Sequence, residues 1–592
     1  MSDINLTVDG IPVSVPQGSN IIKATKKAGQ HVPYFCYHEG LTVVGQCRMC
    51  FVEVEGMPKL ATACSTPVAE GMKVITQSEK VQSGQNASLE FTLLNHPLDC
   101  PICDRGGECK LQDYTYQYGP PLSRMEDEKV LRDKHKSISD QIVLDQERCI
   151  LCTRCVRFSS EIDGKAELVV NNRGNSNVID VFNNAPLKSA FSGNVVDLCP
   201  VGALTAQDFR FAARPWELKS HDAICTGCSM GCNVEIDTKH RHPGIVRPDK
   251  APPNPKIVRL TPRKNQNINR WWMCDEGRWG YHFHNNDELR LQSPMLRRSK
   301  NGALEEVSLK EIQRNIEEYS NQNAWEFWIE DTAPHEEISW AKELRDSWIA
   351  RGRKVEVINP SPASASLLNY WKTLAATPQG AGQINWAQVK KVHSPISLDT
   401  LEKLIPILKL KIAQAVRESK LQWIEYKDSS EFSKLGAEDL LLLSAPKNDT
   451  DLKAMSQASA QCQQLVLWTG TNSRGLLNEG LAPIEYLENS LQGQKAKGPI
   501  FLFAQSTQRK RSEALAQYLA SAPLVIVADS FQSIYTDRAD LILPIQALYE
   551  TRATMTSVEN YAQLSPGIAL NHPNQASIHR GGELVAGPLK LL

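Results

Sequence analysis

RCILCTRCVRF at residues 148–158 and DLCPVGAL at residues 197–204 carry the most specific pattern in this chain. The first stretch spaces Cys149, Cys152 and Cys155 two residues apart, and the second places Cys199 directly before a proline. A three-cysteine run with a Cys-Pro partner is typical of a [4Fe–4S] site, whereas zinc sites usually use two separate Cys-x-x-Cys pairs. No second run with this spacing occurs, so we expect Cys199 to complete the site of the other three.

The other cysteines are also grouped. Fifteen of the chain's sixteen cysteines fall in four groups between Cys36 and Cys274, and Cys462 stands alone. Each group offers four soft ligands, the number that closes one iron–sulfur cluster. A row of such sites is what a protein needs to pass single electrons. Cys462 has no companion and is predicted to be a buried structural thiol.

The first group has the spacing C-x10-C-x2-C-x13-C and comprises Cys36, Cys47, Cys50 and Cys64. Strand-like runs at 4–8 and 11–15, joined by Asp-Gly, precede it, and a helix that Ser19 caps is predicted to end near Gly29. Hairpin, helix and cysteine-bearing loop are the order expected of a β-grasp ferredoxin. The spacing is a longer-looped variant of plant-type [2Fe–2S] sites, which is favoured over a four-thiolate zinc site.

The second group lies in HPLDCPICDRGGECKLQD at residues 96–113, where helix and loop are predicted over 80–120. It contains three cysteines, Cys100, Cys103 and Cys109, and His96 is the only further soft ligand at local spacing. A lone histidine is more often a structural residue, so the local pattern leaves its ligation open. An imidazole in place of a thiolate removes one negative charge, which raises a cluster's potential.

The fourth group also has a spacing that suits [4Fe–4S]. It comprises Cys225, Cys228, Cys232 and Cys274, the last followed by DEGR. A proline-rich, basic stretch at 243–266 is predicted to be an insertion before its final ligand. Three arginines lie among or beside the ligands of the first and third groups: Arg48, Arg154 and Arg157. They either stabilise reduced clusters by their charge or are surface residues that are solvated or paired.

Composition fits an ordinary multidomain protein. The 592 residues are 41% hydrophobic and 22% charged, with a net charge of −1, which gives no reason to expect nucleic acid or an anionic membrane as partner. No apolar run approaches the roughly 18–20 residues of a membrane span. The N-terminus, MSDINLTVDG, shows no signal or transit pattern, so a reducing cytoplasm is expected, and disulfides are not.

After residue 300 the pattern predicts an α/β body with a mainly parallel sheet. Ser308 and Glu311 have the spacing of a capping box at a helix start. Helical segments separate most of the predicted strands. These strands are 325–330, 354–358, 439–444, 465–470, 500–504, 524–529 and 541–543.

Together, GQCRMC, HPLDCPICDRGGECKLQD and the RCILCTRCVRF and DLCPVGAL stretches resemble the large iron–sulfur subunits of bacterial NADH:quinone oxidoreductase, respiratory complex I. The resemblance covers roughly residues 1–210. It implies a [2Fe–2S] cluster on the first group, a [4Fe–4S] cluster on His96 with the next three cysteines, and another on the third group.

Residues 218–285 resemble the [4Fe–4S] domain of molybdopterin oxidoreductases, and the C-terminal half is similar to that fold in degraded form. Residues 539–544 (ADLILP) and Glu550, Thr554, Glu559 and Gln563 match the family pattern, which Ala553, Ser557 and Tyr561 break. Only Cys462 could ligate molybdenum after Cys274. The resemblance therefore implies a fourth cluster away from the main electron path and a body without molybdenum cofactor.

The expected function is an electron-transfer subunit. It would relay electrons from NADH and flavin on a partner subunit to downstream iron–sulfur subunits and quinone. It lacks a convincing G-x-G-x-x-G fingerprint, and we expect no NADH or quinone site on it. We expect it at the cytoplasmic face of the bacterial inner membrane, held there only by partners. The alternatives are a subunit of an NAD-linked molybdenum formate dehydrogenase or hydrogenase, and a zinc-organised scaffold.

The expected fold is multidomain, α+β and α/β. The predicted domains are a [2Fe–2S] ferredoxin-type domain at 1–79, a one-His/three-Cys [4Fe–4S] domain at 80–120, a ferredoxin-like [4Fe–4S] domain at 138–212, a molybdopterin-type [4Fe–4S] domain at 218–285 and a molybdopterin-oxidoreductase-like α/β body at 290–592.

Overall fold

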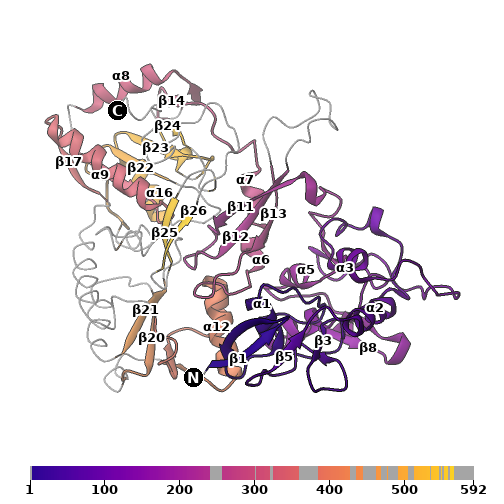
Figure 1. The fold of residues 1–592 in the computed structure, drawn as a ribbon. Coiled ribbons are helices and arrows are strands. Elements are labelled where there is room, and N and C mark those ends of the chain that lie inside the picture. The colour runs from indigo at the N-terminus through magenta and orange to yellow at the C-terminus, as the bar shows by residue number, and fades with distance from the viewer. Residues whose placement is uncertain are drawn as a thin grey trace. The chain divides into compact units, whose positions relative to one another are not determined.

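The described part of the chain falls into two compact units, Met1–Leu218 and Lys219–Leu592, and each is described by itself (Figure 1). The first three cysteine groups belong to the first unit and the fourth group to the second. The computed structural model describes residues 3–239, 256–300, 302–320, 324–358, 384–426, 435–444, 462–467, 472, 477, 491–504, 513–533, 535–545, 549, 553–557 and 561–565.

The first unit begins with a five-stranded mixed sheet in the order β2-β1-β5-β3-β4. The predicted hairpin is confirmed: β1 and β2 are antiparallel, and β1 runs parallel to β5. Asp9 and Gly10 have φ angles of 47° and 80°, as a two-residue hairpin turn requires. The strands are β1 (Asp3–Val8), β2 (Ile11–Pro16), β3 (Phe51–Val54), β4 (Ala61–Thr62) and β5 (Lys73–Ile75).

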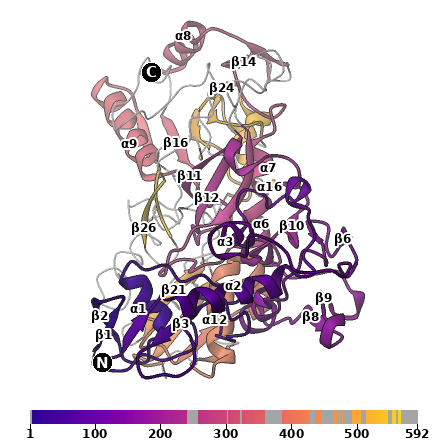
Figure 2. The ribbon, with the colours of Figure 1, turned by 45° about the vertical axis from the view of Figure 1, so that its right-hand side comes forward.

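One helix, α1 (Ile21–Lys27), lies beside β1 and β2 in the views of Figure 1 and Figure 2. The buried side chain of Ile21 belongs to the same hydrophobic cluster as Cys50 and Cys64. The prediction of Ser19 as N-cap is wrong, because Asn20 occupies that position without capping the helix through its side chain. Its amide donates instead to the Cys64 carbonyl at 2.6 Å, which ties the helix start to the first cysteine group.

Two helices frame the second group, as predicted. Ser78 caps the first of them, since its Oγ accepts a hydrogen bond from the Val81 amide at 3.3 Å. The two longer helices pack against each other. The elements are α2 (Glu79–Leu93), the short η1 (Cys100–Ile102) and α3 (Lys110–Tyr118).

The rest of the first unit holds two small sheets, β10-β7-β6 and β8-β9. Their strands are β6 (Lys136–Ser137), β7 (Ile142–Leu144), β8 (Leu168–Asn171), β9 (Val178–Val181) and β10 (Leu204–Ala206). The helical segments are α4 (Arg154–Arg157), the π-helical η2 (Phe158–Asp163), η3 (Gly174–Ser176), η4 (Phe182–Asn184), α5 (Asn194–Leu198) and η5 (Pro215–Glu217).

The second unit opens with an antiparallel sheet around the fourth group, in the order β11-β12-β13. The prediction of an insertion at 243–266 is wrong for its last part, because β13 (Ile257–Pro262) pairs with β12 and buries Ile257 and Leu260. Residues 243–255 of that stretch lie outside the described residues. The other elements here are β11 (Leu218–Ile224), β12 (Asn233–Lys239), α6 (Asp275–Trp279) and α7 (Tyr281–His284).

The C-terminal body contains a seven-stranded sheet, β15-β14-β24-β23-β22-β16-β17, in which the last five strands are parallel. Its strands are β14 (Met295–Arg297), β15 (Leu304–Glu306), β16 (Trp325–Ile329), β17 (Val355–Ile358), β22 (Ile500–Phe503), β23 (Val525–Asp529) and β24 (Leu541–Pro544). Helices α8 (Leu309–Ser320), α9 (His335–Ala350) and α16 (Glu513–Ser521) accompany it, with η9 (Thr536–Arg538).

A second sheet, β19-β18-β20-β21, is parallel throughout. The mainly parallel pattern is confirmed, but the body has two sheets rather than one. Strands β18 and β19 were not predicted, since each has only four residues and at least half of them are polar. The elements are β18 (Lys391–Ser394), α11 (Leu398–Leu404), α12 (Pro406–Arg417), β19 (Gln422–Glu425), β20 (Asp439–Ser444), β21 (Gln463–Leu467) and the separate hairpin β25 (Ala553–Thr556) and β26 (Ala562–Ser565).

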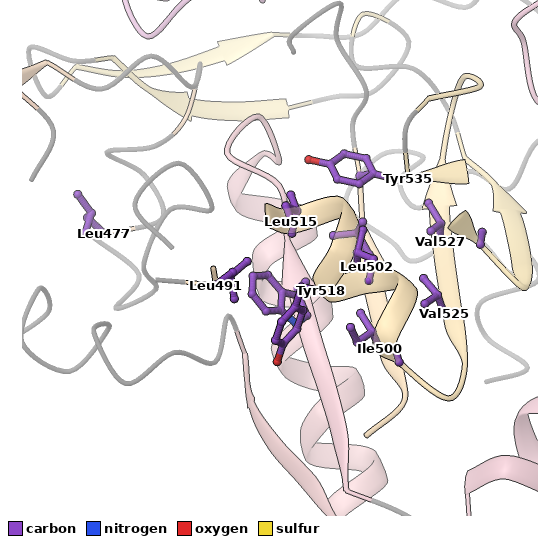
Figure 3. Close-up of a cluster of buried hydrophobic side chains, with 14 of the residues drawn as sticks. Leu477, Leu491, Ile500, Leu502, Leu515, Tyr518, Val525, Val527 and Tyr535 are labelled. Carbon is purple, nitrogen blue, oxygen red and sulfur yellow. The ribbon is translucent and has the colours of Figure 1, made fainter. Parts of the chain in front are cut away.

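Both faces of the seven-stranded sheet are buried. Ile500 and Leu502 pack on one face with α16, as Figure 3 shows, whereas Phe501 and Phe503 belong to the cluster on the other. Burial on both faces is usual for parallel strands. The helix start at Ser308 is confirmed, since the Glu311 amide donates to Ser308 Oγ at 3.3 Å. In the described parts of the chain, no helix is long and apolar enough to cross a membrane.

Candidate iron–sulfur sites

The four thiols of the first group converge. Cys36, Cys50 and Cys64 are at most 1% exposed, and the Cys36 thiol interacts with those of both Cys47 and Cys64. These thiol–thiol hydrogen bonds lower the pKa of Cys36 and raise that of Cys47 and of Cys64. Four thiols this close together repel one another once they are deprotonated. A cation is therefore needed to stabilise all four as thiolates.

Two residues in the left-handed backbone conformation shape the loop of the first group. Gly45 has φ 62° and Arg48 has φ 57°, on either side of Cys47. The Cys36 amide points at Cys47 Sγ at 3.5 Å. Cys50 directly precedes β3 and Cys64 follows β4, so the sheet holds two of the four thiols in place.

In the second group, His96 is held in the form that a metal ligand needs. Burial and the charges of Lys129 and Arg148 lower its pKa to about 4, so the imidazole is neutral at pH 7. Its Nδ1 is buried and has no hydrogen-bond partner among the described residues. Such an orphaned nitrogen fits a ligand role better than a satisfied structural role.

The cysteines of the second group differ in exposure. Cys103 and Cys109 are buried, whereas Cys100 is exposed. Burial raises the pKa of Cys109 to about 11, and it also raises the pKa of Cys103, where the Arg148 charge opposes it. The Arg148 charge thus acts on both His96 and Cys103, and in each case it lowers the pKa.

The third group lines one small, mostly apolar cavity. Cys149, Cys152, Cys155 and Cys199 all face it, together with apolar side chains such as Leu144 and Ile179. Burial and the neighbouring Cys199 raise the pKa of Cys152 to about 11. Leu151 and Thr153 have φ angles of 53° and 59°, and these turns bend the three-cysteine run around the cavity.

The fourth group closes between a hairpin and a helix. The Cys225 amide donates to the Cys232 carbonyl at 2.8 Å, where β11 passes into β12. Cys274 is the N-cap of α6, and its Sγ accepts from the Gly277 amide at 3.4 Å. A Cβ at Gly277 would lie 2.9 Å from Cys225 Sγ and 3.4 Å from Cys274 Sγ, so glycine lets these two thiols approach.

Residues from the C-terminal part of the chain lie against the fourth group. Gln563, on β26, donates to the Gly231 carbonyl at 2.8 Å and accepts a short hydrogen bond from Asn233. Burial and the nearby Cys225 raise the pKa of Tyr549. Gln563 belongs to the degraded sequence motif, whereas Tyr549 carries no local signal in the sequence. Glu550 and Glu559 of that motif lie outside the described residues.

Within the first unit, the third group directly contacts the first. Arg157 donates to the carbonyls of Cys36 and Cys152, and Arg154 donates to the carbonyls of Tyr37, at 2.6 Å, and Leu198, at 3.2 Å. The alternative that these arginines are surface residues holds only for Arg48, which is exposed. Arg154 and Arg157 are 4% and 6% exposed.

The third group also contacts the second. Arg105 donates to the carbonyls of Val196 and Cys199, at 2.6 Å and 2.9 Å. Cys109 Sγ lies 3.8 Å from the Pro200 carbonyl. A Cβ at Gly202 would lie 2.2 Å from Cys103 Sγ, so this glycine permits the closest approach of the two loops.

An ion-pair network joins these same two groups. Arg148 donates to Asp99 Oδ2 from Nε at 3.0 Å and from Nη2 at 2.8 Å, and each residue directly precedes the first cysteine of its group. Asp145 lies 3.3 Å from Arg148 Nε, and Lys134 pairs with Asp99 at 2.6 Å. This network was not predicted from the sequence. The sequence does show charged residues beside the ligands. It does not show which of them pair, because the partners lie about fifty residues apart.

The predicted ligand sets remain predictions. The described residues hold no group of three or more histidine, cysteine or acidic side chains arranged to hold a single metal ion. The convergence of the first and third groups, the burial of most of the thiols and the orphaned nitrogen of His96 are compatible with cluster ligation, in which iron replaces the thiol protons. Cys462, as predicted, is fully buried.

Comparisons with known proteins define the class of the chain: it is an iron–sulfur protein with [2Fe–2S] and [4Fe–4S] cluster-binding domains. Four family models match in sequence order. They are a 2Fe-2S iron-sulfur cluster binding domain at residues 2–79, the NADH-ubiquinone oxidoreductase-G iron-sulfur binding region at 85–124, the ferredoxin-like domain of NADH-quinone oxidoreductase subunit 3 at 139–205, and the molybdopterin oxidoreductase Fe4S4 domain at 218–286.

Over about half its length, the chain is a homologue of the 75 kDa iron–sulfur subunit of complex I. It is 39% identical over 327 residues to the NADH-ubiquinone oxidoreductase 75 kDa subunit of Reclinomonas americana, a match that covers 54% of this chain and 44% of the relative. It is 39% identical over 317 residues to the corresponding NADH-quinone oxidoreductase subunit of Rickettsia conorii, covering 53% of this chain and 44% of that one.

The match spans less than half the length of these relatives. The mitochondrial 78 kDa subunit of Neurospora crassa NADH-ubiquinone oxidoreductase is 42% identical over 303 residues, which cover 50% of this chain and 38% of the relative. A crystal structure of NAD+-reducing [NiFe]-hydrogenase in the H2-reduced state matches with 29% identity and a TM-score of 0.33, over 36% of this chain and 90% of that chain.

Proposed function

We propose that this chain is an electron-transfer subunit of the peripheral arm of NADH:quinone oxidoreductase. It would relay single electrons that originate from NADH at the flavin of a partner subunit towards quinone. The observation that carries the proposal is the packing of three cysteine groups in one compact unit, where the third group contacts the other two. Homology to the 75 kDa subunit of complex I supports the same role.

The ligand sets we propose are the four groups predicted from the sequence. One [2Fe–2S] cluster would bind Cys36, Cys47, Cys50 and Cys64. Three [4Fe–4S] clusters would bind His96, Cys100, Cys103 and Cys109; Cys149, Cys152, Cys155 and Cys199; and Cys225, Cys228, Cys232 and Cys274. When bound, the clusters supply one-electron redox chemistry, and the chain sets their spacing, solvent access and potential.

The third site is proposed as the middle of the relay. Its loops touch ligand residues of both neighbours: Arg157 bonds the carbonyl of Cys36, and Gly202 lies against Cys103 Sγ. Its cavity is lined largely by apolar side chains, which exclude water. A dry, rigidly packed middle site keeps the distances between neighbours short and constant.

The fourth site is proposed to lie off the electron path. It belongs to the second compact unit, and Gln563 binds its loop to the C-terminal body. We propose that this body is related to the molybdopterin oxidoreductase fold and binds no molybdenum cofactor, since Cys462 is the only cysteine after Cys274. The first sheet is proposed to be a β-grasp ferredoxin.

Partners and location follow from the same proposal. The chain would bind a subunit that carries flavin and NADH and, on another surface, downstream iron–sulfur subunits. It would reach the cytoplasmic face of the bacterial inner membrane only through these partners. Neither NADH nor quinone would bind to this chain itself.

Metal analysis tests the proposal directly. Anaerobically purified complex should contain about 14 irons per copy of this chain beyond the iron of its partners, if one [2Fe–2S] and three [4Fe–4S] sites are filled. Low-temperature EPR during NADH titration should show reduction of clusters on this chain. Stoichiometric zinc with little iron, or stoichiometric molybdenum, would contradict the proposal.

A further inference from the structure

Two buried arginines lie between the first and third cysteine groups. Arg154 and Arg157 are the ends of the short helix α4 and flank Cys155. Each guanidinium reaches both groups: Arg154 bonds the carbonyls of Tyr37 and Leu198, and Arg157 bonds those of Cys36 and Cys152. The two side chains therefore cross-link the loops that carry two separate ligand sets.

These two arginines bond backbone carbonyls rather than carboxylates in the described part of the chain. Among the residues that the structure describes, no acidic side chain forms an ion pair with Arg154 or Arg157, and their hydrogen bonds go to backbone carbonyls. Arg148, equally buried, differs in this respect because it pairs with Asp99 and Asp145. Two formal positive charges thus lie at the boundary of the first and third sites.

A third cation adds to this boundary. Lys110 Nζ lies 4.7 Å from the ring centre of Tyr34, and the Arg154 guanidinium lies 5.9 Å from the same ring. Both cations therefore face the same aromatic ring. The aromatic ring and the backbone carbonyls stabilise these charges only in part.

Burial of unpaired positive charge is unfavourable unless something negative compensates it. Thiolate-ligated iron–sulfur clusters carry negative charge that increases on reduction, and the local charge is one of the factors that set their potential. The guanidinium groups therefore interact more favourably with reduced than with oxidised clusters. At this depth the interaction is weakly screened by salt.

We propose that Arg154 and Arg157 are positioning residues that clamp the first and third sites together and raise the midpoint potentials of both. The proposal rests on the function proposed above, since it requires clusters at these sites. It goes beyond that function by naming the side chains that couple two of the sites and the charge by which they act.

The test is an EPR-monitored redox titration of the intact complex carrying Arg154→Gln or Arg157→Gln. Both variants should lower the midpoint potentials of the first and third clusters and leave that of the fourth unchanged. Arg48→Gln is the matched control: it removes an arginine next to Cys47, but this side chain is exposed. It should shift the first potential less than either buried variant.

The Arg157→Lys variant distinguishes the effect of the positive charge from that of the hydrogen bonds. It can also be measured if a glutamine variant fails to assemble. Lysine keeps the positive charge but cannot bond the carbonyls of Cys36, Thr42 and Cys152 together. It should leave the potentials nearer to wild type than glutamine does, while amide hydrogen exchange in residues 36–44 becomes faster.

Two results would overturn the clamp. One is unchanged potentials in all buried variants with both clusters assembled, and the other is an equal shift in Arg48→Gln and Arg157→Gln. Absence of clusters from the wild-type sites would instead contradict the proposed function, so the two failures are distinguishable.

Discussion

Replacing Arg148 with methionine should destabilise the first compact unit strongly. The Arg148 side chain is 3% exposed and contacts Asp99 Oδ2 at 2.8 Å and Asp145 Oδ2 at 3.3 Å, and the side chain of Asp145 is 2% exposed. Removing one partner of a buried ion pair costs about 3–5 kcal/mol, because the other charge stays buried without compensation. Asp99 keeps Lys134 at 2.6 Å. We therefore expect the lower end of that range, about 3 kcal/mol.

This loss can be measured as a melting temperature. For a domain of 150–250 residues, each 1 kcal/mol shifts Tm by roughly 2–4 °C, so Arg148→Met should lower it by roughly 6–12 °C. Anaerobic differential scanning calorimetry of the full chain gives the shift, and hydrogen exchange assigns the transition to residues 1–218.

The matched control lies in the same unit. Arg124 also bonds one carboxylate through Nε, at 2.7 Å, and Nη2, at 2.6 Å, here on the two oxygens of Glu90, but its side chain is 83% exposed. Arg124→Met should change Tm little, because exposed pairs are screened by water and salt. The double variant with Asp99→Asn and Arg148→Met should recover part of the loss. If Arg148→Met lowered Tm no more than Arg124→Met, the reasoning about burial would be refuted.

Three further predictions concern the ligand loops. His96→Cys should keep a cluster at the second site but lower its midpoint potential, since a thiolate adds negative charge; an unchanged potential in EPR titration would exclude His96 as ligand. Gly202→Ala should cost about 1–3 kcal/mol by overpacking and perturb the second cluster's EPR signal. Gly227→Ala is the control: its new Cβ would lie at an ordinary 3.6 Å from a thiol, so this variant should neither lose stability nor change the EPR signal. Burial alone would raise the pKa of Asp99, but hydrogen bonds from Lys134 and Arg148 lower it below its ordinary value. The ionised Asp99 therefore stabilises the fold fully above the unfolded-state pKa of about 4, and this contribution is lost as pH falls through the folded-state pKa. Arg148→Met should thus unfold at higher pH than wild type in acid titration. Identical acid midpoints would contradict this.

The features that depend on local spacing could be predicted from the sequence. The three-cysteine run with Cys199 indicated a single site, and the structure places all four thiols around one cavity. The β1–β2 hairpin and the helix start at Ser308 follow from turn and capping chemistry within a few residues. Even the eroded C-terminal pattern pointed to Gln563, which contacts the fourth group.

The rest depended on contacts between distant residues. Asn20 replaced Ser19 as helix cap because Cys64, far along the chain, offers its amide a carbonyl. The burial of Arg154 and Arg157 depends on where residues 36–42 lie, which no pattern within α4 shows. Residues 257–262 looked like part of a basic insertion because their pairing partner, β12, was not apparent from composition.

The most direct test of the relay is rapid-freeze EPR of NADH-reduced complex with Cys152→Ala, which removes a ligand of the middle site, and with Cys228→Ala as the control in the fourth. We predict that Cys152→Ala leaves one of the first and second clusters reducible by NADH within the turnover time, while the other is reduced only by dithionite. Cys228→Ala should leave all three conducting clusters reducible at the wild-type rate. Reduction of both outer clusters at the wild-type rate in Cys152→Ala would contradict a relay through the third site.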